Sequence, residues 1–193
     1  TSSAPASAAD VALLTQRRVA PATYARRMSN SLSNSVSNSG DRPVSVVTGA
    51  NSGIGRATAI HLAKQGHRVA GTVRSIDRAE KLQRMSTEAG VEIELFELDV
   101  ADDDSVRDGF AELLATTGRV DHLVNNAGVG GNSVAEECPP QMYLDVMNVN
   151  LKSVFFLCQA AARQFIKQGS GGKIISIASL LSFQGGIRVP SYT

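Results

Sequence analysis

Residues 46–55 read VVTGANSGIG, Val46 to Gly55, and join the end of an apolar run to the start of a helical pattern. Glycines have no Cβ and let the backbone approach a ligand closely, while a helix N-terminus offers unpaired N–H groups and a positive dipole end to phosphates. The turn therefore predicts a site for the pyrophosphate of a nucleotide, although an ordinary strand-to-helix turn is the alternative. The residues expected at this site are Thr48, Gly49, Asn51, Ser52, Gly53, Ile54 and Gly55.

Short apolar runs alternate with helical periods from Val44 onward. The pattern predicts strands over residues 44–48, 68–73, 92–98, 120–124 and 173–177, and helices over residues 53–65, 78–89, 103–116 and 149–168. Strands that alternate with helices form a parallel sheet covered on both faces. The predicted fold class is α/β, a Rossmann-type doubly wound parallel sheet in three layers, α/β/α, which we expect to be incomplete at the C-terminus.

The first forty residues differ in composition from the rest of the chain. They are rich in Ser, Ala and Arg and contain a single acidic residue, Asp10. Large apolar side chains are too few to offset the entropy lost on ordering, so we predict a disordered leader over residues 1–40 and a partial dinucleotide-binding domain over residues 41–193. Such a leader also resembles a transit peptide for an organelle, a mitochondrion or a plastid; an unstructured extension is the alternative.

Composition excludes several classes of partner. The 193 residues carry a net charge of +1 with the basic residues dispersed, which gives no footprint for nucleic acid, and no apolar run is long enough to span a membrane. Cys138 and Cys158 show neither a disulfide framework nor a paired metal spacing, which favours reduced thiols and a cytoplasmic location. His61, His67 and His122 have no ligand spacing, so no metal site is predicted.

Two later segments extend the pattern of the glycine turn. Leu98-Asp99-Val100 ends the third predicted strand, and Asn125-Asn126-Ala127-Gly128 follows the fourth. With the TGxxxGxG turn, and in this order, they resemble the short-chain dehydrogenase/reductase family over residues 43–193. Sugar-nucleotide epimerases share the fold but usually space their glycines as TGxxGxxG, which argues against that class. The resemblance implies cofactor contacts by Asp99, Val100, Asn126, Ala127 and Gly128.

Some of these positions also have a plain structural interpretation. A lone Asp after a strand is often a turn or helix-capping residue, and an Asn-Gly pair often forms a tight polar turn. After the second strand an Asp or Glu would favour NAD(H), but Val73 is followed by Arg74, whose guanidinium fork suits a 2′-phosphate, with Arg56 as a second candidate. We therefore predict NADP(H) as the favoured cofactor and NAD(H) as the alternative, unless Arg74 is a solvated surface residue.

The family's active site uses Asn, Ser, Tyr and Lys, and the resemblance assigns the first three to Asn150, Ser179 and Tyr192. It implies that Tyr192 is the general acid or base, that Ser179 holds the reacting oxygen, and that Asn150 bends its helix and positions a water. The family's lysine is expected four residues beyond Tyr192, past Thr193, so we expect the chain as given to be a fragment without activity. The implied reaction is hydride transfer between NAD(P)(H) and a carbonyl or secondary alcohol.

Substrate and partners are less well defined. Residues 171–193 resemble the sugar-acid dehydrogenases of the family, whereas residues 66–74 resemble its general ketoreductases, so a sugar acid is one candidate. The strand over 173–177 is expected to form an exposed apolar edge. The helix over 149–168 carries an apolar stripe for the core or a subunit interface, and we expect a homo-oligomer, dimer or tetramer, when complete. If the protein truly ends at Thr193, the alternative is a non-catalytic dinucleotide-binding protein or a degenerate paralogue.

Overall fold

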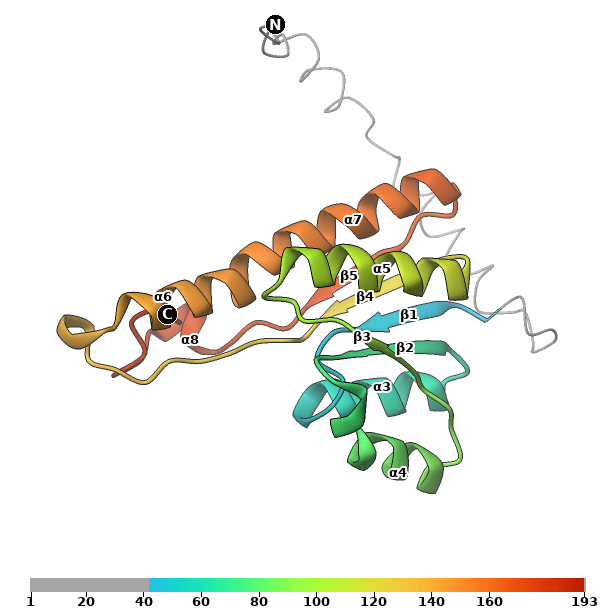
Figure 1. Ribbon diagram of the computed structural model, residues 1–193, viewed down its shortest axis with the longest axis horizontal. Helices are drawn as coiled ribbons and strands as arrows, with labels where there is room; N and C mark the ends of the chain where they lie inside the picture. The colour runs from blue at the N-terminus through green and yellow to red at the C-terminus, as the bar shows by residue number, and fades with distance from the viewer. Residues whose placement is uncertain (1–41, 193) are drawn as a thin grey trace, which may run out of the picture. The chain divides into compact units, whose positions relative to one another are not determined.

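A five-stranded parallel sheet lies at the centre of residues 42–192, which the computed structural model describes (Figure 1). The predicted leader over residues 1–40 lies outside the described residues. The strand order is β3-β2-β1-β4-β5. The strands are β1 (Val44–Val47), β2 (Arg68–Val73), β3 (Glu94–Glu97), β4 (His122–Asn125) and β5 (Lys173–Ser176). This order confirms the predicted Rossmann-type sheet.

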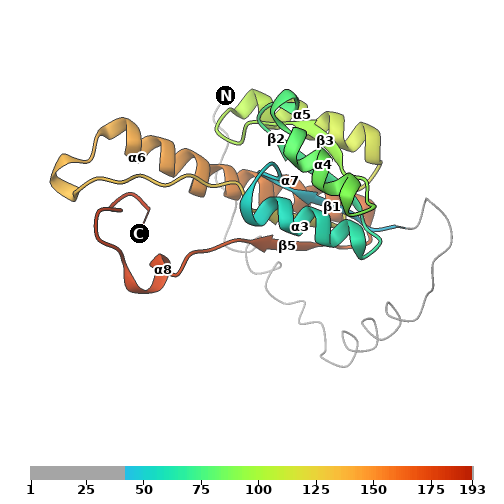
Figure 2. The same ribbon diagram turned by 90° about the horizontal axis from the view of Figure 1, so that it is seen from below.

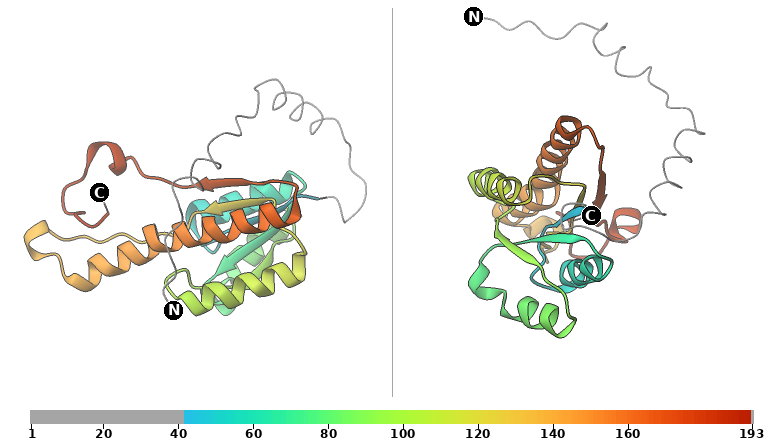
Figure 3. Two further views of the ribbon diagram at one scale, coloured as in Figure 1. Left: turned by 90° about the horizontal axis from the view of Figure 1, so that it is seen from above. Right: turned by 90° about the vertical axis from the view of Figure 1, so that its right-hand side faces the viewer.

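Helices cover both faces of the sheet. One face carries α3 (Gly53–Lys64) and α4 (Glu80–Glu88), and the other carries α5 (Asp103–Thr117) and α7 (Ser153–Gln168), as Figures 1 and 3 show. Beyond the carboxyl ends of the strands lie α6 (Pro140–Met147) and α8 (Leu181–Gln184) (Figure 2). Short 3₁₀ helices span Ile76–Arg78 and Ala135–Glu137, and a π-helical turn, Asn148–Lys152, joins α6 to α7. The predicted three layers are present.

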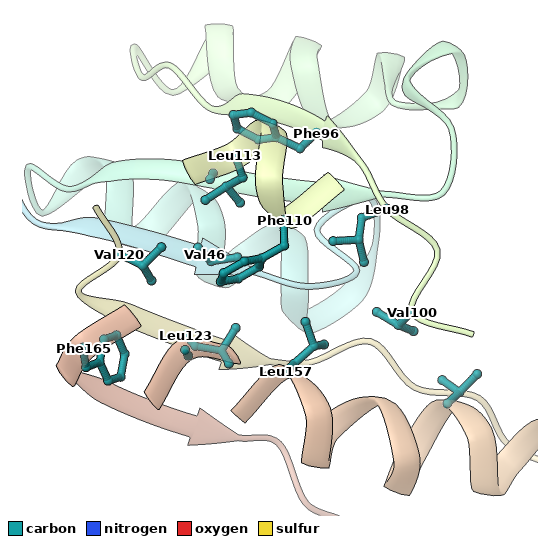
Figure 4. Close-up of a cluster of buried hydrophobic side chains, with 13 residues drawn as sticks. Val46, Phe96, Leu98, Val100, Phe110, Leu113, Val120, Leu123, Leu157 and Phe165 are labelled. Atoms are coloured by element: carbon teal, nitrogen blue, oxygen red, sulfur yellow. The ribbon is translucent and has the colours of Figure 1, made fainter. Parts of the chain in front are cut away.

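The hydrophobic core is divided between the two faces because successive strand residues point to opposite sides. Val46 packs with the α5 and α7 side, whereas its neighbour Val47 packs with the α3 and α4 side. Figure 4 shows the larger cluster, which joins Val46, Phe96, Leu98, Val120 and Leu123 to Phe110, Leu113, Leu157 and Phe165. The smaller cluster contains Val47, Ala50, Ala59, Val69, Leu82 and Val124.

Hydrophobicity marked the strands but not their exact bounds. The predicted strand 120–124 forms as His122–Asn125, and the predicted strand 92–98 forms as Glu94–Glu97. Val120 is fully buried in the larger cluster yet precedes the ladder, because burial and backbone pairing are separate requirements. The helix expected over 149–168 begins as the π-helical turn, and only its remainder is α7.

The edge strand β5 is exposed along its whole length, as predicted. It pairs with β4, and no strand within residues 42–192 pairs with its other edge. Ile174, Ile175 and Ile177 are 39%, 52% and 42% exposed. The stripe of α7 is in part a core stripe, since Leu157, Ala161 and Phe165 are buried, while Phe155 and Ile166 on the same helix are exposed. None of the helices described is long and apolar enough to cross a membrane.

Candidate cofactor and substrate site

The predicted site residues follow the carboxyl ends of all five strands. Thr48 follows β1, Arg74 follows β2, Asp99 lies just after β3, Asn126 follows β4 and Ser179 lies just after β5. In a parallel sheet these ends share one edge, and the crevice of such a fold opens where the chain order reverses, here between β1 and β4. The fold therefore gathers the predicted positions at the edge where ligands bind.

The glycine turn is tightly packed at Gly55 and open at Gly53. A Cβ on Gly55 would lie 2.3 Å from Asn126 Nδ2 and 2.4 Å from the carbonyl oxygen of Gly49, so only glycine fits there. Gly53 has φ +53° but a Cβ on it would meet nothing within 4 Å, so its surface is open. Ser52 is the N-cap of α3 and makes no side-chain capping hydrogen bond, which leaves the first-turn N–H groups available to a phosphate.

The turn after β1 is locked to the turn after β4. Thr48 Oγ1 accepts hydrogen bonds from the N–H groups of Asn126 and Ala127, both at 3.0 Å, and donates to the carbonyl oxygen of Val124 at 3.4 Å. Asn126 Nδ2 donates to the carbonyl oxygens of Thr48 at 2.9 Å and Gly49 at 3.3 Å. These bonds give Thr48 and Asn126 a role in holding the turn, and their direct contact with a cofactor stays a prediction.

The two candidate phosphate-binding arginines differ in how they are held. Arg56 Nη1 donates to the carbonyl oxygen of Asn51 at 3.0 Å, while Asn51 Nδ2 donates to the carbonyl oxygen of Arg78 at 3.1 Å. Arg74 is exposed, and among residues 42–192 it makes no ion pair. The Arg74 guanidinium therefore remains available for a phosphate, whereas Arg56 braces the glycine turn.

Asp99 stabilises the turn after β3, which was the alternative to cofactor contact at this position. Its Oδ1 accepts the N–H of Ala101 at 3.0 Å, and its own N–H donates to Ser105 Oγ at 2.9 Å. Asp102, not Asp99, is the N-cap of α5, where it accepts the N–H of Ser105 at 2.7 Å. Val100 is buried in the core. Contact of Asp99 and Val100 with an adenine ring stays a prediction.

The three predicted catalytic residues come from different elements. Asn150 lies in the π-helical turn, and its side-chain amide is bonded in both directions to the backbone of Val129. Half-buried Ser179 accepts the N–H of Leu181 at Oγ, 3.2 Å away, which leaves its hydroxyl proton free to donate. Tyr192 is half-buried at the end of a turn closed by its N–H and the carbonyl oxygen of Val189, 3.0 Å apart. Within the described chain no hydrogen bond joins these three side chains to one another.

A loop after β4, residues 126–133, connects the parts of the site, and the sequence predicted only its first residues. Ser133 N–H donates to the carbonyl oxygen of Arg188 at 2.9 Å, and Arg188 Nε donates to Asn132 Oδ1 at 3.1 Å. A Cβ on Gly131 would lie 3.2 Å from Ser191 Oγ. The loop thus touches β1 through Thr48, the π-helical turn through Asn150, and the segment that ends in Tyr192.

A polar cluster that the sequence did not predict lies at the opposite end of the sheet. Ser45 Oγ is hydrogen-bonded to His67 Nδ1 at 2.7 Å and to His122 Nδ1 at 3.0 Å, and the two rings are 5.2 Å apart. Burial lowers the pKa of both histidines. No group of three metal-ligating side chains is found in residues 42–192. The cluster belongs to the structural base of the sheet rather than to the site.

Comparison with known proteins identifies the family. The family model described as short chain dehydrogenase matches residues 43–193. The chain belongs to the short chain dehydrogenase family. A 2-dehydro-3-deoxy-D-gluconate 5-dehydrogenase from Dickeya dadantii (strain 3937) is 45% identical to this short chain dehydrogenase over 150 residues, which are 78% of this chain and 58% of that protein. The chain therefore spans less than two thirds of the length of this curated relative.

Two solved structures share the fold of this short chain dehydrogenase. A metagenomic short-chain oxidoreductase in complex with NADP is 35% identical with a TM-score of 0.72, covering 78% of this chain and 68% of that chain. A structure assigned as an NAD(P)-dependent gluconate 5-dehydrogenase from Beutenbergia cavernae, with bound NADP at low occupancy, is 39% identical with a TM-score of 0.70. The second match covers 78% of this chain and 59% of that chain.

Proposed function

We propose that the whole protein is an NAD(P)-dependent oxidoreductase that transfers a hydride between its cofactor and a carbonyl or secondary alcohol. The observation that carries this proposal is the packing of the glycine turn on Asn126, with Gly55 too close to that side chain for any Cβ. Such packing holds the N-terminus of α3 open toward the crevice at the carboxyl edge. The residues matching the family's Asn, Ser and Tyr come from elements that approach the same edge.

The residues present fit a dinucleotide. Backbone N–H groups at Gly53, Ile54 and Gly55 would hold the pyrophosphate, since the surface at Gly53 is open and the Ser52 side chain does not cap the helix. Arg74 would pair with a 2′-phosphate through its free guanidinium, which supports NADP(H) as the favoured cofactor and NAD(H) as the alternative. When bound, the nicotinamide supplies or takes up the hydride.

The chain's own residues would manage the proton. Reduction of a carbonyl leaves negative charge on its oxygen, and the Tyr192 hydroxyl would donate a proton to that oxygen. Ser179 would hold the same oxygen in place with the hydroxyl proton that its contact with Leu181 leaves free. Asn150 would act through position, because its two bonds to Val129 fix the loop that runs from Asn126 toward the Tyr192 segment.

A sugar acid is the proposed substrate class, and the names of the relatives from Dickeya dadantii and Beutenbergia cavernae support it. A homo-oligomer, dimer or tetramer, is proposed for the whole protein because α7 keeps exposed apolar residues, including Phe155, Phe156 and Ile166, that a second subunit would cover. The cytoplasmic location and the organelle alternative stay predictions.

The test uses protein from the full reading frame, whatever its extent on either side of residues 1–193. Calorimetry measures NADP binding. NADP reduction is followed with 2-dehydro-3-deoxygluconate as the alcohol, and NADPH oxidation is followed with the ketone that its oxidation forms. Tyr192→Phe and Ser179→Ala should each lower turnover by about 10²- to 10⁴-fold without changing NADP affinity. Ser182→Ala is the matched control, because Ser182 contributes only its backbone N–H to Ser179. NADP binding without turnover of any substrate would instead support a non-catalytic dinucleotide-binding protein.

A further inference from the structure

Arg188 has a backbone conformation that nothing in the catalytic proposal explains. Its φ is +63°, and it is the one non-glycine residue with positive φ in the described part of the chain. Side chains with a Cβ rarely adopt this conformation, and where they do, the surrounding contacts must impose it. Strained residues of this kind concentrate at ligand sites and switches, so Arg188 calls for a functional explanation.

Contacts on two sides impose the conformation. The carbonyl oxygen of Arg188 accepts the N–H of Ser133 at 2.9 Å, and its Nε donates to Asn132 Oδ1 at 3.1 Å. The guanidinium has five N–H donors, of which the bond to Asn132 uses one. Arg188 is exposed and makes no ion pair within residues 42–192. The structure thus fixes the stem of an arginine while leaving its fork unpaired.

Arg188 lies four residues before Tyr192 in the chain. It directly precedes the turn that the N–H of Tyr192 closes on the carbonyl oxygen of Val189. Two residues of this turn, Pro190 and Ser191, line a cavity of about 450 Å³. The other lining residues are Ala135, Cys138, Pro140, Tyr143 and Leu144.

Ser191 supplies an independent indication that this cavity takes a ligand. The residue is 8% exposed, and its Oγ is buried without a hydrogen-bond partner among the described residues. A buried hydroxyl without a partner is unfavourable, and a polar ligand in the cavity would satisfy it. An arginine with free donors and a serine without a partner therefore lie three residues apart in the chain, and the proposed general acid Tyr192 directly follows the serine.

We propose that Arg188 is a specificity-determining residue that binds the carboxylate of an anionic hydroxy or keto acid, while Ser191 Oγ bonds a hydroxyl of the same molecule. A carboxylate can accept two parallel hydrogen bonds from a guanidinium, and its negative charge would pair with the positive charge of Arg188. The inference rests on the proposed oxidoreductase function and adds which end of the substrate this chain recognises. The acid would lie with its carboxylate at Arg188 and its reacting carbon at Tyr192.

The experiment compares an acid with its neutral amide in the full-reading-frame protein with NADP(H). Arg188→Gln should raise KM for 2-dehydro-3-deoxygluconate by about 10- to 100-fold and leave KM for the amide unchanged. Arg188→Lys should give a KM for the acid between those of the parent protein and Arg188→Gln, since an ammonium keeps the positive charge but cannot make two parallel hydrogen bonds. Arg188→Asn tests the same loss in a residue type that tolerates positive φ, in case the Gln variant fails to fold. Arg84→Gln, an exposed arginine of α4, is the control.

The outcomes separate this inference from the function on which it rests. Equal changes in KM for the acid and the amide, or none for either, would overturn the assignment of Arg188 while leaving the oxidoreductase proposal intact. If the parent protein binds NADP but turns over neither compound, the sugar-acid substrate class of the proposed function fails instead. Calorimetric binding of the acid that is present in the parent and lost in Arg188→Asn would then still support a carboxylate site at Arg188.

Discussion

Asn150 and Val129 hold each other through two hydrogen bonds. The N–H of Val129 donates to Asn150 Oδ1 at 2.9 Å, and Asn150 Nδ2 donates to the carbonyl oxygen of Val129 at 2.7 Å. A side-chain amide thus pairs with a backbone amide as a neighbouring strand would. Because Asn150 lies in the π-helical turn, Asn148–Lys152, the widened helix and the loop after β4 are one unit.

Asn150→Asp should loosen that unit. The carboxylate still accepts the N–H of Val129, but its second oxygen faces the Val129 carbonyl oxygen, and two acceptors cannot bond. We expect faster hydrogen exchange at the Val129 amide and a loss of about 1–2 kcal/mol in the free energy of unfolding. Exchange measured by mass spectrometry checks this, with Asn148→Asp in the same turn as control. Unchanged exchange at Val129 would contradict the assigned role of Asn150.

Gly55→Ala should abolish NADP binding through a clash that Gly130→Ala does not create. The added Cβ would meet Asn126 Nδ2 at 2.3 Å and the carbonyl oxygen of Gly49 at 2.4 Å, which forces α3 and the loop after β4 apart. A Cβ on Gly130 meets nothing within 4 Å, and Gly130 does not have positive φ. Overpacking of this kind destabilises by about 1–3 kcal/mol, so urea unfolding accompanies the calorimetry. Full NADP affinity in the Gly55 variant would show that the turn is not the binding site.

Arg74→Gln should change the preference between the two cofactors. Hydrogen bonds to a charged group contribute about 1.5–3 kcal/mol, so loss of the guanidinium should weaken NADP binding by about 10- to 100-fold and leave NAD binding unaltered. Parallel titrations with NADP and NAD measure the ratio. Arg84→Gln removes an exposed arginine of α4 and serves as control. A variant that keeps its NADP preference would make Arg74 a solvated surface residue.

The histidine pair predicts a loss of stability at acidic pH. Burial is the main cause that lowers the pKa of both His67 and His122 below the usual value of 6.5; Lys173 adds to the lowering, and Asp121 opposes it. The unfolded chain then binds more protons than the folded chain as the pH falls below 6.5. The free energy of unfolding should therefore stay level above that pH and decline as the pH falls through the lowered values.

Urea unfolding from about pH 8 to about pH 5 tests this dependence. A double variant, His67→Gln with His122→Gln, should lose the histidine contribution to the dependence of the free energy of unfolding on pH. His61→Gln is the matched control, because it replaces a histidine that is exposed on α3 and lies outside the cluster. If the free energy of unfolding of the double variant depends on pH as that of the parent protein does, the histidine pair is not the cause of the dependence.

The elements of the fold were predictable because each leaves a local pattern. The glycine turn, the alternation of strands with helices and the exposed edge at β5 all depend on residues close together in the sequence. The contacts that build the site leave no such pattern. Thr48 and Asn126 are 78 residues apart, and Asn150 and Val129 are 21 apart, so nothing in either segment alone indicates the partner. Val120 shows the same limit for strand bounds, since its burial in the core looked like strand pairing.

The positive φ of Arg188 and the cluster of Ser45 with His67 and His122 could not be predicted from the sequence, for related reasons. Positive φ is predictable where glycine or asparagine stands, but Arg188 acquires it from contacts with Asn132 and Ser133, more than fifty residues upstream. His67 and His122 lack metal-ligand spacing, and only the register of β1 with its two neighbours brings both rings to Ser45. Tertiary pairing, not sequence pattern, creates these features.

The central place of β1 has a consequence for the order of folding. Ser45 of β1 pairs with His122 of β4, which lies 77 residues further along the chain. During synthesis, one edge of β1 therefore stays unpaired until β4 has been made. Until then the growing chain can pair only β1, β2 and β3, and β1 (Val44–Val47) is an unpaired apolar edge strand of that partial sheet. Contacts between residues far apart in the sequence slow folding, and the partly folded intermediates expose apolar surface that aggregates. A nascent chain of this protein should therefore depend on chaperones most strongly in the interval between synthesis of β3 and of β4.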